Sequence, residues 1–454
     1  MNTSFFGELL QTISDRGRAL LDRGRDRRGG TEARSESLVE LCEHLLSGRG
    51  EASGVARARE ILIEYAELTT GPRIAFFEAL AKRFGADAER MKAAFAAWEL
   101  EPNDKTAAAL HAASEPRRQE LFRRLNLAPG GTAALVAMRE QLMDVLPNRP
   151  ELQAVDDDFV HLFTSWFNRG FLVLRHIDWS TQANILEKII RYEAVHEIHD
   201  WDDLRRRIDP EDRRCYAFFH PALVDEPLIF VEVALTRDIP EAIAPILAKT
   251  RDIIEPEKAR TAVFYSISNC QRGLAGVSFG NFLIKQVVEE ICRELPKLSN
   301  LVTLSPAPTF AKWLKRERAA EASVVLSEAD KQLLTSLDEP GWWNDEEKVE
   351  ALRDPMKRAA AYYYLRAKSP RGMPVDPVAR FHLGNGARLE RIDWLADASD
   401  KGIAQSFGLM VNYLYDLEHI EKNHEAFAEQ RTVVASNAVQ RLLRPALELV
   451  PIAG

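Results

Sequence analysis

The sequence contains few cysteines and no paired ones. Its 454 residues include only Cys42, Cys215, Cys270 and Cys292, and none of them forms a C-x-x-C pair. This spacing argues against a structural zinc site, and it favours a reducing compartment, the cytoplasm, as the default location. Cys270 borders a glycine-rich segment and could be a reactive thiol, but a small buried hydrophobic residue is the preferred interpretation.

The sequence also lacks long apolar runs and an excess of basic residues. No apolar run approaches 18 residues, so no membrane span is expected. The N-terminus has no apolar core followed by a small-residue cleavage site, and the C-terminus PIAG is not a peroxisomal address. A formal net charge of −9 argues against nucleic acid as the main partner. A local basic pocket for a small phosphorylated ligand remains compatible with this charge.

Clusters of metal-ligating side chains are absent from the sequence as well. His196 and His199 lie three residues apart and could share a metal ion on a helix, but no third ligand is evident near them. We therefore expect no metal site and no metal cofactor.

The pattern of apolar residues divides the chain into two regions. Up to about residue 167, apolar residues recur at i, i+3 or i+4, and i+7, and Gly-, Pro- and Ser-rich breaks separate the segments. After that point, short runs rich in Val, Ile and aromatics predict strands, with a second helical stretch over about 327–367. We predict an all-helical assembly domain over 1–167 and a mixed α/β domain with inserted helices over 168–454.

Three glycines, Gly273, Gly276 and Gly280, lie between a predicted strand, TAVFYSIS, and a helical pattern, FLIKQVVEEICREL. A glycine-rich turn between a strand and a helix can bring backbone N–H groups close to phosphate oxygens. The spacing matches neither a Walker A loop nor the G-x-G-x-x-G fingerprint. A turn that binds no ligand remains an alternative. The segment from Gln271 is similar to the Q/R-x-x-G-x-G/A loop of the GNAT acyltransferase superfamily, which binds the pyrophosphate of coenzyme A.

Two further segments carry side chains suited to proton chemistry. Ser305 in TLSPAPTFAKWL lies between a predicted strand and a turn that Pro306 and Pro308 keep extended. His382 in PVDPVARFHLGNG comes just before the turn pair Asn385-Gly386, and we place it at the end of a strand. Each residue alone also fits a structural interpretation, a turn-capping hydroxyl or a buried structural histidine.

Taken together, these segments resemble the malonyl-CoA decarboxylase family. The resemblance rests on HPALVDEPLIFVEVALT, FYSISNCQRGLAGVSFGNFLIKQVVEE, TLSPAPTFAKWL, DPVARFHLGNGARLERIDW and SFGLMVNYLYDLE, which span about 215 to 418 in this order. The family's catalytic domain is GNAT-like, so the resemblance implies a helical N-terminal domain followed by a GNAT-like mixed α/β domain.

The resemblance also implies which residues form the site. The family's serine–histidine dyad falls on Ser305 and His382, and its tyrosine falls on Tyr415, with Tyr413 as a neighbour. Eukaryotic members have a glutamate where this chain has Ser278, so no acid–base role is expected at that position. The implied acyl-CoA-binding residues are Ser266, Gly273, Ala275, Gly276, Val277, Ser278, Phe279, Gly280 and Asn281.

The implied reaction is the decarboxylation of malonyl-CoA to acetyl-CoA and CO2, within fatty acid metabolism. It requires no cofactor beyond the coenzyme A of the substrate. The family forms dimers and tetramers, which predicts a homo-oligomer. The missing peroxisomal tail and long organellar leader fit a cytoplasmic location. Two alternatives remain open: a GNAT-type N-acetyltransferase that transfers an acetyl group from coenzyme A to an amine, and a non-catalytic protein that binds or senses acyl-CoA.

Overall fold

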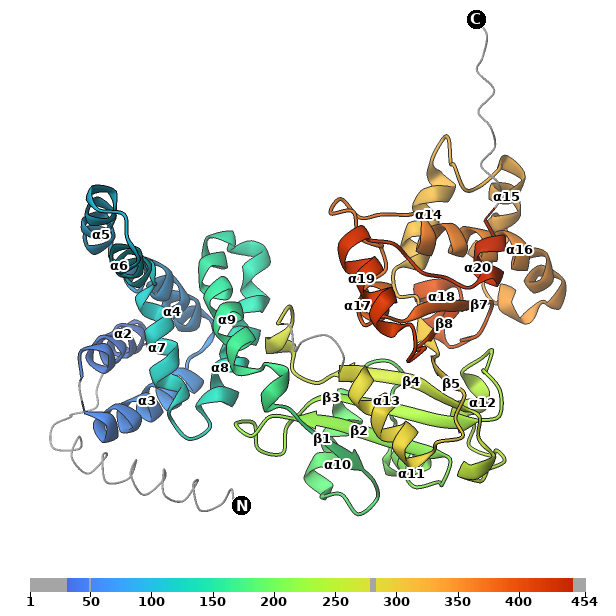
Figure 1. The fold of residues 1–454 in the computed structure, drawn as a ribbon, viewed down its shortest axis with the longest axis horizontal. Coiled ribbons are helices and arrows are strands. Elements are labelled where there is room, and N and C mark those ends of the chain that lie inside the picture. Colours follow the sequence, from blue (N-terminus) through green and yellow to red (C-terminus); the bar gives the residue numbers. More distant parts are fainter. Residues whose placement is uncertain (1–30, 49, 278–282, 444–454) are drawn as a thin grey trace, which may run out of the picture. The chain divides into compact units, whose positions relative to one another are not determined.

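The computed structural model describes residues 31–48, 50–277 and 283–443, and these form two units (Figure 1). The described residues of the first unit run up to Val173 and include two later segments, His220–Glu226 and 271–277. The second unit contains Leu174–Phe219, Pro227–Cys270 and the described residues from 283 onward.

The first unit consists of helices, as the spacing of apolar residues predicts. Polar caps begin several of them: Asp87 accepts hydrogen bonds from the backbone of Glu89 and Arg90 at the start of α5, and Asn103 forms a capping box with Thr106 at the start of α6. Their interior contains buried phenylalanines together with aliphatic side chains. The helices are α2 (Thr31–Ser47), α3 (Glu51–Ala66), α4 (Thr70–Arg83), α5 (Ala88–Leu100), α6 (Asp104–Ser114), α7 (Arg117–Asn126), α8 (Gly131–Val145) and α9 (Gln153–Trp166).

The second unit is built around an eight-stranded sheet of order β1-β2-β3-β4-β5-β8-β6, with β7 paired to β8. β2, β3 and β4 pair antiparallel in sequence, whereas β4 and β5 are parallel. The strands are β1 (Val173–Ile177), β2 (Arg213–Phe219), β3 (Pro227–Thr236), β4 (Thr261–Asn269), β5 (Asn300–Thr303), β6 (Ser305–Pro306), β7 (Arg388–Asp393) and β8 (Met410–Leu414).

Helices connect and cover these strands. Because β4 and β5 are parallel, the chain must cross over between them, and α13 lies on this connection. The helices of the second unit are α10 (Ala183–Tyr192), α11 (Trp201–Ile208), α12 (Ala244–Leu247), α13 (Leu283–Glu294), α14 (Phe310–Ala319), α15 (Glu328–Leu333), α16 (Glu346–Leu365), α17 (Pro377–Gly384), α18 (Asp400–Ser406), α19 (Ile420–Gln430) and α20 (Asn437–Arg441). The predicted order of a helical region followed by a mixed α/β region is thus confirmed.

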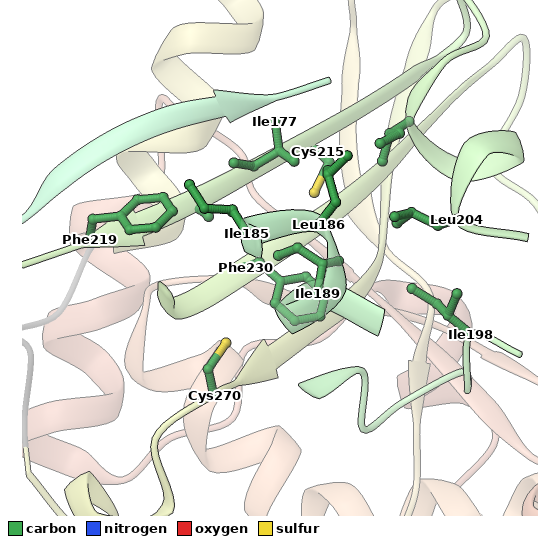
Figure 2. Close-up of a cluster of buried hydrophobic side chains, with 12 residues drawn as sticks. Ile177, Ile185, Leu186, Ile189, Ile198, Leu204, Cys215, Phe219, Phe230 and Cys270 are labelled. Carbon is green, nitrogen blue, oxygen red and sulfur yellow. The ribbon is translucent and has the colours of Figure 1, made fainter. Parts of the chain in front are cut away.

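Part of the second unit's core lies between the sheet and α10 and α11 (Figure 2). Ile185 and Ile189 of α10 are fully buried against residues of β2 and β3 such as Ala217 and Phe230. Cys270 belongs to this cluster and is 7% exposed, as expected for a small buried hydrophobic residue. Within the described residues, every helix is too short or too polar to cross a membrane.

Strand β8 brings together the strands that carry the candidate site residues. It pairs with β5 through Val302 and Leu414, with β6 through Ser305 and Val411, and with β7 along its length. The ends of β5, β6 and β8 therefore meet in the interior of the second unit.

Candidate active site

Ser305 and His382 come together although 77 residues separate them in the sequence. Ser305 begins β6, and its Oγ lies 3.2 Å from Nε2 of His382. Both side chains are buried, with Ser305 5% and His382 2% exposed. The serine–histidine pair that the resemblance implies is therefore within hydrogen-bonding distance.

His382 lies on the last turn of α17, not at the end of a strand, so the predicted strand position was wrong. The sequence before it specifies a short helix: Asp376 caps the N-terminus by accepting from the backbone N–H of Ala379, and Pro377 occupies the first turn. Asn385 caps the C-terminus. The turn expected at Asn385-Gly386 is present, but it ends a helix, and β7 begins only after it.

Tyr415 completes the surroundings of the imidazole. Its hydroxyl lies 2.8 Å from Nδ1 of His382, and its backbone N–H donates to the carbonyl of Leu301 at 2.8 Å. The ring of Tyr413 stacks on the imidazole with centroids 4.7 Å apart. Both ring nitrogens of His382 thus face hydroxyl groups, and the tyrosine ring restricts its rotation.

Thr303, at the end of β5, is a site residue that the sequence analysis missed. Its Oγ1 accepts a hydrogen bond from the Ser305 hydroxyl at 2.9 Å and another from the backbone N–H of Tyr413 at 3.1 Å. Its carbonyl accepts from the side-chain amide of Asn412 at 2.8 Å. The available signal was the spacing, because residues i and i+2 of an extended chain point to the same side.

Burial controls the charges in this group. It lowers the pKa of His382 to about 3 and raises the pKa of the Tyr415 hydroxyl. Near neutral pH the imidazole is therefore uncharged, and the tyrosine keeps its proton. A neutral imidazole carries one hydrogen and one lone pair, so it can relay a proton between its neighbours.

The low pKa of His382 predicts a pH dependence of stability. In an unfolded chain the pKa of histidine is about 6.5, so between about pH 6.5 and pH 3 the unfolded protein binds a proton that the folded protein does not. Lowering the pH through this window therefore destabilises the fold. We expect His382→Gln to reduce the loss of unfolding free energy between pH 7 and pH 4.5 by about 2–3 kcal/mol. Denaturant unfolding of both proteins at the two pH values measures this difference, and equal losses would contradict it.

A second chain of hydrogen bonds ties together the segments that carry Ser305 and His382. Thr309 Oγ1 lies 2.5 Å from the hydroxyl of Tyr363 on α16, and this hydroxyl donates to Asp376 Oδ2 at 3.2 Å. Thr309 follows Ser305 by four residues, and Asp376 is the N-cap of the helix that carries His382. The chain fixes the two segments relative to each other.

Ser266, the other serine implied by the resemblance, belongs to a different group. Its buried hydroxyl lies 2.9 and 2.7 Å from the two carboxylate oxygens of Glu193, and Ser268 donates to the same carboxylate at 3.2 Å. Ser266 pairs across the sheet with Glu232 on β3. It therefore lies outside the chain of hydrogen bonds that joins Ser305 to Tyr415.

The glycine turn belongs to the first unit, where it packs on α8. A Cβ on Gly273 would lie 2.1 Å from the carbonyl oxygen of Val136, so only glycine fits there. Gly276 has a φ of +77°, which also favours glycine. Arg139 donates to the carbonyls of Gly273 and Ala275, both at 2.8 Å. Two of the three glycines thus have a structural reason that needs no ligand.

The remaining residues of the predicted acyl-CoA loop are described only in part. Val277 is 7% exposed, and its N–H donates to the carbonyl of Leu274 at 3.0 Å. The predicted binding residues Ser278, Phe279, Gly280 and Asn281 lie outside the described residues.

Comparison with known proteins identifies the family. A family model for the malonyl-CoA decarboxylase C-terminal domain matches residues 170–451, more than half of the chain, and one for the N-terminal domain matches residues 84–167. The chain belongs to the malonyl-CoA decarboxylase family. This result confirms the resemblance that the motifs indicated.

Individual relatives agree over most of the chain. The mitochondrial malonyl-CoA decarboxylase of Anser anser anser is 35% identical over 462 residues, which cover 94% of this chain and 89% of that protein. Among solved structures, malonyl-CoA decarboxylase from Rhodopseudomonas palustris has a TM-score of 0.87 and 59% identity, covering 90% of this chain and 99% of the other. The enzyme from Agrobacterium vitis also has a TM-score of 0.87, with 55% identity and coverage of 90% and 100%.

Proposed function

We propose that this protein converts malonyl-CoA to acetyl-CoA and CO2. One observation carries the proposal: in a chain of this family, Ser305, His382 and Tyr415 form a continuous buried chain of hydrogen bonds. Relatives that are 35–59% identical over most of the chain are named malonyl-CoA decarboxylases.

The chemistry explains why these side chains suffice. Malonyl-CoA carries a carboxylate β to a thioester carbonyl, so loss of CO2 leaves its electron pair on the thioester enolate. The carbonyl itself accepts these electrons, and the reaction requires neither a metal ion nor a further cofactor. The protein must stabilise the enolate and then protonate its carbon.

We assign these two tasks to the hydroxyl–imidazole pair. The Ser305 hydroxyl donates a hydrogen bond to the malonyl carboxylate or to the developing enolate. The carbon receives its proton from His382, directly or through Ser305. Because the resting imidazole is neutral, it takes up a proton at Nδ1 as it releases the one at Nε2, and solvent supplies the net proton that the reaction consumes. Tyr415 orients the imidazole through Nδ1, and the buried surroundings favour loss of the carboxylate as neutral CO2.

The glycine turn is the proposed binding site for the pyrophosphate of coenzyme A. The carbonyl and the N–H of a trans peptide point in opposite directions. Because the Ala275 carbonyl accepts from Arg139, the N–H of Gly276 in the same peptide points away from that guanidinium. We place the pyrophosphate on this side of the turn, close to the N–H of Gly276.

Incubating the purified protein with malonyl-CoA and no acceptor tests the proposal. We expect acetyl-CoA and CO2, with deuterium in the acetyl methyl group when the reaction runs in D2O, because the added proton comes from exchangeable groups. Binding without turnover would support the non-catalytic alternative. Acetyl transfer that requires an added amine would support the acetyltransferase.

We also propose that the protein acts in the cytoplasm as a homo-oligomer, a dimer or tetramer. The support is the behaviour of the family and the predicted role of the helical region in assembly. Light scattering of the full chain at micromolar concentration distinguishes these states from a monomer.

A further inference from the structure

The Thr303 hydroxyl receives two hydrogen bonds in the interior of the second unit. The residue is fully buried, and its Oγ1 accepts from the backbone N–H of Tyr413 and from the hydroxyl of Ser305. A backbone amide can only donate, so it always occupies one acceptor position of Oγ1. The second acceptor position holds the Ser305 proton.

This second bond restricts what His382 can do. A serine hydroxyl has a single hydrogen, and while Thr303 accepts it, the 3.2 Å contact with His382 requires Nε2 to be the donor. A neutral imidazole carries one hydrogen, so Nδ1 is then bare. Nδ1 accepts from the Tyr415 hydroxyl 2.8 Å away. All donors point the same way, from Tyr415 through His382 and Ser305 to Thr303.

We propose that Thr303 is a positioning residue that selects the Nε2–H tautomer of His382 by accepting the hydroxyl proton of Ser305. The assignment of the tautomer follows from the hydrogen bonds alone, whereas its role in catalysis rests on the proposed function. In the resting protein, His382 is not a base that removes the Ser305 proton to make a nucleophile. It presents a hydrogen to Ser305 Oγ instead. The Ser305 hydroxyl can turn from Thr303 toward a substrate oxygen while Nε2–H continues to donate to it.

The alternative arrangement has a different consequence that can be measured. Without an acceptor at residue 303, the Ser305 hydroxyl would donate to Nε2, and the hydrogen of the imidazole would move to Nδ1, pointing at Tyr415. Thr303→Val has nearly the same shape as threonine but no hydroxyl, so it creates this situation. Thr303→Ser keeps the acceptor and is the matched control.

The direct test is the ¹⁵N NMR spectrum of the full chain labelled at histidine, with the His382 signals identified by their loss in His382→Gln. We expect hydrogen on Nε2 in the wild type and in Thr303→Ser, and on Nδ1 in Thr303→Val. We also expect kcat of Thr303→Val to fall at least about tenfold with KM within about twofold, since a wrong tautomer mainly lowers kcat. Thr303→Ser should keep most of the wild-type kcat.

Several outcomes would overturn the proposal. If the ¹⁵N NMR spectrum of the wild type shows hydrogen on Nδ1 of His382, the proposal is wrong. This result needs no variant, so the test holds even if Thr303→Val fails to fold. The proposal is also wrong if folded Thr303→Val keeps the wild-type tautomer of His382 or the full wild-type kcat. If the wild type forms no acetyl-CoA but shows Nε2–H that moves in Thr303→Val, the proposed reaction fails while the role of Thr303 in the tautomer stands.

Discussion

Ser305→Ala and His382→Gln are each expected to lower kcat for acetyl-CoA formation by about 10²–10⁴, with a smaller effect on KM. In the proposed mechanism, Ser305 and His382 stabilise and protonate the thioester enolate, and the charge on this enolate appears only after CO2 begins to leave. Ser305 supplies a hydrogen bond to that charge, and His382 supports it through the 3.2 Å contact at Nε2. In the same proposal, coenzyme A provides most of the binding of the substrate, so KM changes less than kcat. Steady-state kinetics with malonyl-CoA measure the effect.

Matched controls separate chemistry from folding. Ser406 is a buried serine of the same unit whose Oγ lies 3.0 and 2.8 Å from the carbonyl oxygens of Gly402 and Leu409, so Ser406→Ala removes a comparable group away from the dyad. His419 is exposed and pairs with Asp416, and His419→Ala serves as the histidine control. Both should keep kcat within about threefold, the range of surface and structural substitutions that leave the site intact. A folded Ser305→Ala or His382→Gln with near-wild-type kcat would remove the dyad from the mechanism.

The elements of the fold were predictable because each depends on its own run of residues. TAVFYSIS is β-branched and aromatic, and it forms β4 (Thr261–Asn269) as expected. The pairing was not predictable. β8 joins β5, β6 and β7, and its register with Ser305 spans more than 100 residues of sequence. Nothing in a five-residue strand specifies such distant partners, because these contacts depend on how the whole sheet packs.

In the candidate site, too, some residues could be predicted from local sequence motifs and others depend on tertiary contacts. Ser305, His382 and Tyr415 could be selected because motifs identify them, and the structure brings these three side chains within hydrogen-bonding distance. For Thr303 the sequence offers only the two-residue spacing from Ser305, and this weak signal becomes informative once the Tyr413 N–H and Ser305 are seen to face the threonine.

The helix that carries His382 illustrates why local patterns can mislead. α17 has only eight residues, and the turn pair Asn385-Gly386 that follows it suggests the end of a strand, although Asp376 and Pro377 mark the start of a helix. The structure makes it a helix through the buried Asp376 cap and through packing with α19, neither of which leaves a periodic signal. His424 of α19, for example, lies with Nδ1 2.7 Å from the carbonyl of Gly384.

Gly386→Ala is expected to lower the free energy of unfolding by about 3 kcal/mol or more and to reduce activity with it. Gly386 has a φ of +82°, and a Cβ there would lie 2.1 Å from the carbonyl oxygen of Ile420 at the start of α19. The backbone must shift to relieve this overlap. The adjacent N–H of Ala387 donates to the His382 carbonyl at 3.1 Å, so we expect the shift to reach the backbone that carries the imidazole. Denaturant unfolding and kcat of the same preparation measure both effects.

Gly130→Ala separates the cost of the left-handed backbone from the cost of the contact with Ile420. Gly130 has a φ of +74°, but a Cβ there would meet nothing within 4 Å. Its substitution should cost only the strain of the left-handed backbone, about 1 kcal/mol, and should leave kcat unchanged. If Gly386→Ala costs no more than Gly130→Ala, the contact with Ile420 is not tight, and α19 does not fix the end of α17. If it costs more and kcat falls in the protein that remains folded, the position of His382 depends on a glycine that itself carries no chemistry.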